Sequence, residues 1–163
     1  MEIRFHGSNT FEIETGVSRV VMDPFPKFNI SGVVEGALVT TMSHVNESQI
    51  GVGKWAKKSQ VISDPGEFEV AGLAFRGVAT PRSDDTNPRG LNTVYTMDAE
   101  GMTVCHLGHL SSPLSSQAQQ MLGKVDILIV PAGGPGNIGP EEAATTLRQL
   151  EPRIVIPVFA GNG

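Results

Sequence analysis

Hydrophobic and polar residues alternate with a period of two in much of the first half of the chain, as in β-strands that bury one face. Phe11 and Ile13 would face a core while Glu12 and Glu14 face water. The same alternation, or short apolar runs between turn residues, predicts strands at Ile3–His6, Phe11–Glu14, Arg19–Met22, Ala37–Thr41, Val61–Ser63, Glu67–Val70, Leu73–Val78, Thr93–Met97 and Thr103–His106. The last two flank Glu100-Gly101 and form a predicted hairpin.

The last third of the chain changes to strands that alternate with helices. A short helix is predicted over Ser115–Leu122, ended by Gly123. Pro140 suits a first helical position, which predicts a second helix over Pro140–Leu150. The apolar runs Val125–Val130 and Ile154–Val158 are predicted strands, the first buried on both faces. The pattern predicts an α+β sandwich, two sheets packed face to face with helices outside, as one domain over residues 1–163.

Composition narrows the class of protein. Among 163 residues, 12 are basic and 17 acidic, a net charge of −5, which argues against nucleic-acid binding because that affinity comes mainly from Lys and Arg. No apolar stretch is long enough to cross a membrane and no signal-peptide layout opens the chain, so we expect a cytoplasmic protein. One cysteine excludes an internal disulfide, and four histidines suffice for one metal centre but are few for two.

Polar clusters follow directly on the ends of predicted strands. They are Asp23, Ser43–Gln49, Arg82–Asp85 and Gly108–Ser112. If these strand ends meet at one edge of the sandwich, the clusters line a single cleft, which is where a site is expected in such a fold.

Several segments, taken in order, resemble the metallo-β-lactamase superfamily, in particular its small Zn-dependent hydrolases of the β-lactamase fold. The resemblance spans nearly the whole chain and rests on Phe5–Glu14, Val21–Phe25, Pro65–Val70, Arg89–Tyr95, Cys105–Leu110 and Arg153–Val158. It implies an αββα sandwich of two mixed sheets with helices outside. It also implies a descent from hydrolases that use metal ions.

The chemistry of that family depends on a His-x-His-x-Asp-His loop after a buried strand, whose side chains hold zinc ions that convert water to hydroxide. The corresponding stretch here is Thr41–Ile50, which reads TMSHVNESQI. His44 stands where the first ligand stands. The other three ligand positions hold Asn46, Ser48 and Gln49. The resemblance therefore implies that most of this ligand set is lost.

The remaining ligand positions of the family are also changed. Ser83, followed by Asp84, stands where the family has a histidine. His109 replaces the bridging carboxylate, and Phe159 replaces the final histidine. The resemblance thus implies a degenerate site, a cleft lined by Asp23, Asn46, Ser48, Gln49, Ser83, Asp84 and Phe159.

Two interpretations of His44 and His109 stay open. The resemblance puts them on opposite sides of one cleft, where with Asp84 or Asp85 they would make a single-metal site for zinc or another divalent ion. Otherwise both are ordinary polar residues of the cleft and no cofactor is bound. We favour the second, a non-hydrolytic protein that binds a small molecule or a protein partner. The alternative is a metal-dependent hydrolase of small esters, lactones or sugar phosphates.

A third hypothesis concerns assembly. Members of the family usually continue beyond the strand that matches Ile154–Val158, whereas this sequence ends at Gly163 and is short at its C-terminus. A last strand without a covering segment would leave one face exposed. This favours a homo-oligomer.

Overall fold

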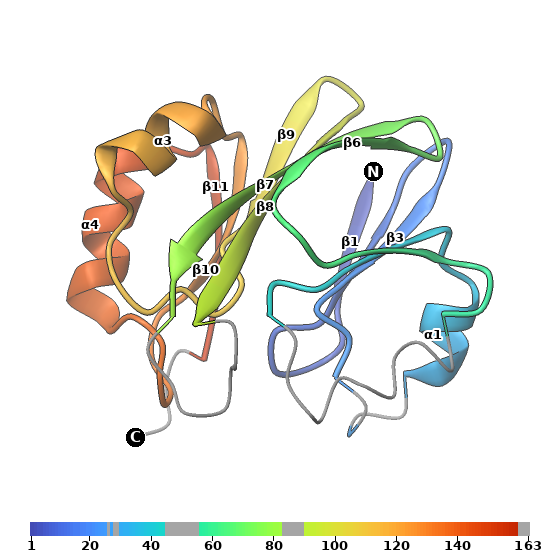
Figure 1. Cartoon of the computed structure of the whole chain (residues 1–163), viewed down its shortest axis with the longest axis horizontal. Helices are drawn as coiled ribbons and strands as arrows, with labels where there is room; N and C mark the ends of the chain where they lie inside the picture. The colour runs from blue at the N-terminus through green and yellow to red at the C-terminus, as the bar shows by residue number, and fades with distance from the viewer. Residues whose placement is uncertain (26, 28–29, 45–55, 83–89, 160–163) are drawn as a thin grey trace.

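Two β-sheets packed face to face organise the structure, a computed structural model that describes residues 1–25, 27, 30–44, 56–82 and 90–159 (Figure 1). In spatial order the first sheet consists of β1 (Glu2–Phe5), β2 (Phe11–Glu14), β3 (Arg19–Met22), β4 (Val39–Thr41) and β5 (Gln60–Ile62). The second consists of β11 (Ile154–Val158), β10 (Ile127–Pro131), β9 (Met102–His106), β8 (Leu91–Ala99), β7 (Leu73–Pro81) and β6 (Gly66–Val70). The helices among the described residues are α1 (Ser31–Glu35), α3 (Ser116–Leu122) and α4 (Pro140–Leu150).

Both sheets are mixed. In the first sheet β1, β2 and β3 pair antiparallel, whereas β3, β4 and β5 pair parallel. In the second sheet β6 to β9 pair antiparallel, and β9, β10 and β11 pair parallel. Figure 1 shows α3 and α4 on the outer side of the second sheet and α1 beside the first. The predicted α+β sandwich with helices outside is confirmed.

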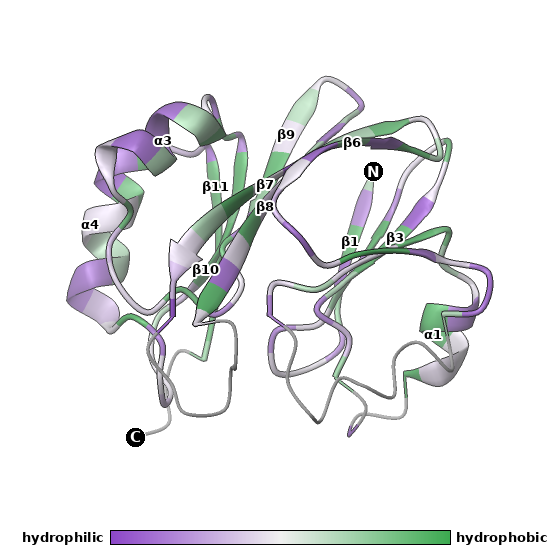
Figure 2. Ribbon diagram, in the orientation of Figure 1, coloured by the Kyte–Doolittle hydropathy of each residue, from purple (hydrophilic) through white to green (hydrophobic). Residues whose placement is uncertain are grey.

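The alternation of side chains explains where the main core lies. Phe11, Ile13 and Val20 of the first sheet belong to one buried cluster with Met97 and Ile129 of the second. The predicted burial of both faces of β10 is confirmed, because the alternate residues of that strand pack in a second cluster with α3 and α4. Figure 2 shows hydrophobic positions along these strands and both kinds of position on α3 and α4, as expected of helices that cover a core on one side.

The two predicted helices form where their end signals stand. Ser115 caps α3, since its hydroxyl accepts a hydrogen bond from the backbone N–H of Ala118. Pro140 opens α4, and Glu142 accepts a hydrogen bond from the N–H of Gly139. Thr146 is fully buried on the inner side of α4, where its hydroxyl donates to the carbonyl of Glu142.

Two features differ from the sequence-based expectation. Helix α1 has five residues, no side-chain cap and no acidic residue in its first turn, so the sequence carries no signal for it. Strands β7 and β8 extend beyond the predicted segments to Pro81 and from Leu91, and their pairing continues to the Pro81–Leu91 position. Thr80 and Asn92 pair near this end of the hairpin. None of the described helices is long and apolar enough to span a membrane.

The parallel strands position the candidate site. Strands β3 and β4 end at Met22 and Thr41, and the parallel strands β9 and β11 of the other sheet end at His106 and Val158. Ligands in such sheets bind beyond the carboxyl ends of parallel strands.

Candidate functional site

Side chains that follow these strand ends meet between the two sheets. The imidazole rings of His44, after β4, and His109, after β9, have centroids 4.3 Å apart and planes inclined by 70°. The ring of Phe159, after β11, lies 5.7 Å from that of His109. His44 is buried, and His109 and Phe159 are partly buried. The structure therefore brings together the two histidines and the phenylalanine that the sequence analysis singled out.

Asp23 is buried and bonds to the backbone next to His44. Its Oδ1 accepts a hydrogen bond from the backbone N–H of Ser43 at 2.6 Å, and its Oδ2 accepts one from Nδ2 of Asn9 at 2.9 Å. The residue is 1% exposed and has a positive φ of 47°, a conformation that aspartate tolerates better than most residues. Because both carboxylate oxygens bond within the chain, Asp23 holds the loop before His44 in place.

His106 is fully buried and forms part of the same support. Its Nε2 lies 3.1 Å from the carbonyl oxygen of Asn9, and its Nδ1 accepts a hydrogen bond from the N–H of Gly108 at 3.2 Å. These partners fit a neutral ring with its proton on Nε2. Burial lowers the pKa of His106, although the charge of Asp23 acts in the opposite direction. A neutral ring that bonds through both nitrogens fixes the turn before His109.

His109 is neutral near pH 7. Burial lowers its pKa to about 4, against the opposing charge of Asp23 and with smaller contributions from His44 and Arg82. Arg82 also donates a hydrogen bond from Nη1 to the carbonyl oxygen of His109 at 3.0 Å. A neutral imidazole keeps a nitrogen lone pair, so it can accept a proton, accept a hydrogen bond or bind a metal ion.

The described residues do not form a metal centre of the family's kind. No group of three or more His, Cys, Asp or Glu side chains suited to a metal ion occurs among them. Two imidazoles on one tetrahedral zinc ion, at bond lengths of about 2.0–2.1 Å, would have ring centroids about 5 Å apart. The 4.3 Å between His44 and His109 is shorter and corresponds to direct ring contact.

Five further residues predicted for the cleft lie outside the described residues. They are Asn46, Ser48, Gln49, Ser83 and Asp84, and Asp85 lies there with them. The described part of the site therefore consists of His44, His109 and Phe159 above the support from Asp23 and His106.

Sequence reasoning missed Asn92. Its Oδ1 accepts the backbone N–H of His109 at 2.8 Å, and the residue is fully buried. Asn92 stands in the segment Arg89–Tyr95 that contributed only to the family resemblance. One feature of the sequence could have indicated this residue: an asparagine, a residue depleted in strands, stands near the start of a strand that is rich in β-branched and aromatic residues.

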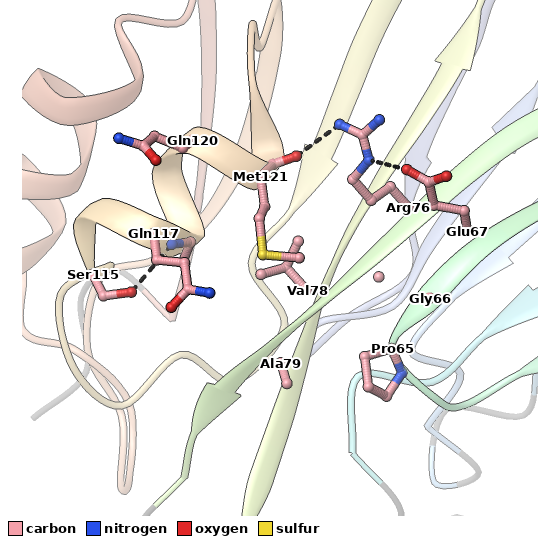
Figure 3. Close-up of a pocket in the computed structure, with 12 residues that line it drawn as sticks. Pro65, Gly66, Glu67, Arg76, Val78, Ala79, Ser115, Gln117, Gln120 and Met121 are labelled. Carbon is pink, nitrogen blue, oxygen red and sulfur yellow. Dashed lines mark hydrogen bonds and ion pairs between the residues drawn. The ribbon is translucent and has the colours of Figure 1, made fainter.

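A groove in the described part of the molecule lies away from this site. It runs between β6, β7 and α3, with Val78, Ala79 and Met121 among its lining residues. Figure 3 shows Arg76 across it, where the guanidinium binds Glu67 and donates to the carbonyl oxygen of Met121. None of the site residues above lines this groove.

Comparisons with known proteins agree with this fold. Residues 2–159 match the model of the beta-lactamase superfamily domain. One similar crystal structure is that of a Thermotoga maritima protein assigned to the Zn-dependent hydrolases of the metallo-β-lactamase superfamily. The two structures superpose with a TM-score of 0.77 and 30% sequence identity, and the superposition covers 98% of this chain and 76% of that chain. Igni18, a metallo hydrolase of Ignicoccus hospitalis, has a TM-score of 0.70 at 19% identity, with 98% of this chain and 82% of that chain covered, and supports the fold alone.

A relative by sequence is a UPF0173 metal-dependent hydrolase of Lysinibacillus sphaericus, 23% identical over 97% of this chain and 84% of the relative. The names of these relatives favour the hydrolase alternative over the expectation of a non-hydrolytic protein. The match over residues 2–159 and the arrangement of the two sheets show that this chain belongs to the metallo-β-lactamase superfamily, in the branch of its Zn-dependent hydrolases.

Proposed function

We propose that this chain keeps the hydrolase fold but binds a small polar molecule at His44 and His109 without a dinuclear metal centre and without hydrolysing that molecule. The observation that carries the proposal is the direct contact between the rings of His44 and His109, with centroids 4.3 Å apart, and the presence of Phe159, which cannot bind a metal ion, beside His109. Loss of a site on a retained fold is physically straightforward, because core packing and site chemistry are separate constraints.

The chemistry of the cleft suggests the class of ligand. The neutral ring of His109 offers a hydrogen-bond donor and an acceptor, the ring of His44 adds further ring nitrogens, and Phe159 adds an apolar face beside His109. A molecule with a carbonyl or phosphoryl oxygen next to a sugar or lactone ring would satisfy both kinds of surface. A hydrolase at this site would act on the same class of compounds. Binding without turnover therefore distinguishes the proposed binding protein from a hydrolase.

A second candidate is a hydrolase with one metal ion, and it is favoured by the names of the relatives. His44 and His109 would hold the ion together with a carboxylate from the segment that contains Asp84 and Asp85, outside the described residues. Such an ion would lower the pKa of a bound water molecule and so provide hydroxide.

The experiment compares binding and turnover in one set of samples. Small esters, lactones and sugar phosphates are added to the protein with and without Zn²⁺ or Mn²⁺, and histidine ring signals and product formation are followed by NMR. The proposal predicts saturable shifts of the His44 and His109 signals, no product with either metal, and loss of binding in His109→Ala. His6→Ala is the matched control, because His6 bonds to Glu12 rather than to the site residues. Metal-dependent turnover that His44→Ala abolishes would establish the second candidate instead.

A further inference from the structure

Contacts from elsewhere in the chain hold the backbone on which each of His44 and His109 is carried. One ring follows β4 in the first sheet, and the other follows β9 in the second. The two segments are far apart in the sequence and belong to different sheets. A third element contacts both of them and can fix their relative position. That element is the start of β8, where Asn92 and Thr93 contact both segments.

Asn92 holds the segment that carries His109. Its Oδ1 accepts the N–H of His109 at 2.8 Å, and its Nδ2 donates to the carbonyl oxygen of Leu107 at 3.0 Å. The same Nδ2 also donates to the hydroxyl of Thr80, which in turn donates to the carbonyl oxygen of Asn92. One buried amide therefore spans the turn at Gly108 and is itself fixed by the neighbouring strand.

Thr93 holds the segment that carries His44. Its backbone N–H donates to the carbonyl oxygen of Ser43 at 2.6 Å, a hydrogen bond between the two sheets. The N–H of Ser43 binds Asp23 on the other side, so the residue before His44 is held at both its backbone groups. Consecutive residues of β8 thus reach both histidine segments.

The two segments also touch directly. A Cβ atom on Gly108 would lie 2.3 Å from Oγ of Ser43 and 2.5 Å from Oδ1 of Asn92. Only glycine permits this approach, and φ of Gly108 is +62°. The contact leaves little room for the two segments to shift relative to each other.

We infer that Asn92 is a positioning residue that, together with the N–H of Thr93, sets the contact between the rings of His44 and His109. Asn92 is fully buried and acts through the backbone of His109. The inference concerns the His44–His109 pair of the proposed function but holds with or without a metal ion, because every contact that carries it is made within the chain.

The test measures the ring contact directly. The chain has four histidines, so protein labelled at histidine gives few ring signals, which single substitutions assign. We expect a cross-peak from nuclear Overhauser transfer between His44 and His109 in the unsubstituted protein. We expect Asn92→Ala to abolish this cross-peak while the contact between His106 and Phe11 persists, as an internal control for the fold. Neither readout depends on turnover or on bound metal.

Two further variants separate positioning from general stability. Thr80→Val removes a partner of Asn92 that does not contact His109, so the His44–His109 cross-peak should remain. Asn92→Asp keeps an acceptor for the N–H of His109 but replaces the donor to the carbonyl oxygen of Leu107 by a second carboxylate oxygen, so the cross-peak should weaken. The inference is overturned if folded Asn92→Ala keeps the cross-peak, if Thr80→Val loses it to the same extent, or if the unsubstituted protein lacks it. Should Asn92→Ala fail to fold, an undiminished cross-peak in folded Asn92→Asp overturns the inference.

Discussion

At the scale of single residues, Gly108 determines how closely the two sides of the site approach. The space that its side chain would occupy is filled by Ser43 and Asn92. An alanine there would meet atoms at 2.3–2.5 Å and would also adopt an unfavourable positive φ. The residue is therefore a packing requirement of the site.

Gly108→Ala should lower the free energy of unfolding by about 3 kcal/mol, from overpacking together with backbone strain. Gly101→Ala is the matched control, since φ of Gly101 is +76° but no atom of the described residues lies within 4 Å of the place that a Cβ would take. The control should lose only about 1 kcal/mol. Urea unfolding measures both values, and equal losses in the two variants would contradict the packing argument.

The residues of the site were predictable only in part. The sequence pointed to His44, His109 and Phe159 because each occupies a ligand position of a resembling family, and the structure places their rings together. Their contact distance was not predictable, because it depends on hydrogen bonds from Asn92 and Thr93 in a strand that is remote in sequence. Local patterns do not contain such contacts.

At the scale of elements, strands with alternating or continuous apolar residues were found from the sequence, as β2 and β10 show. Helix α1 was not, because it is short and lacks a capping side chain. The extension of β7 and β8 was missed because Pro81 and Asn92 are poor strand formers, whereas tertiary pairing and the hydrogen bonds of Asn92 override that preference.

The parallel strands of the second sheet are tied together at their starts by Asp126. Its carboxylate accepts the N–H of Thr103, and its backbone carbonyl accepts the N–H of both Arg153 and Ile154. The hydrogen bond from the N–H of Thr103 and then the hydrogen bond from the ammonium of Lys124 hold the pKa of Asp126 below its ordinary value. A carboxyl group with a lowered pKa stabilises the fold when ionised, and this contribution is lost as the pH falls through that lowered pKa.

Asp126→Asn should therefore be less stable than the unsubstituted protein at pH 7, and the difference should shrink as the pH falls below the ordinary aspartate range. Thermal unfolding at a series of pH values measures this difference. A difference that stays constant down to pH 3 would show that the charge of Asp126 does not contribute.

At the scale of the whole molecule, β11 is an edge strand with exposed Ile154 and Val155. The N–H of Ile154 donates to the carbonyl of Asp126, and the carbonyl of Val158 accepts from the N–H of Ala132, at the two ends of β10. Because the backbone groups of successive residues in a strand point to opposite sides, those of Val155 and Pro157 face the open edge. Pro157 has no N–H to donate, which disfavours pairing with another strand. A homo-oligomer formed at β11 would therefore rest on side-chain contacts rather than on strand pairing.

Replacement of both Ile154 and Val155 by serine should convert an oligomer to a monomer at micromolar concentration, as measured by sedimentation velocity. The double substitution Val17→Ser and Leu38→Ser, at exposed apolar residues away from β11, should leave the oligomer intact. An unsubstituted protein that sediments as a monomer would contradict self-association.

We propose that the family fold persists in this chain without the family's dinuclear metal centre. Elemental analysis of protein purified without chelator and without a metal-affinity tag tests this proposal, with the His44→Ala/His109→Ala double variant as reference. We expect far less than one zinc, manganese or iron ion per chain, with no difference between the two proteins. Near-stoichiometric metal that disappears in the double variant would contradict it.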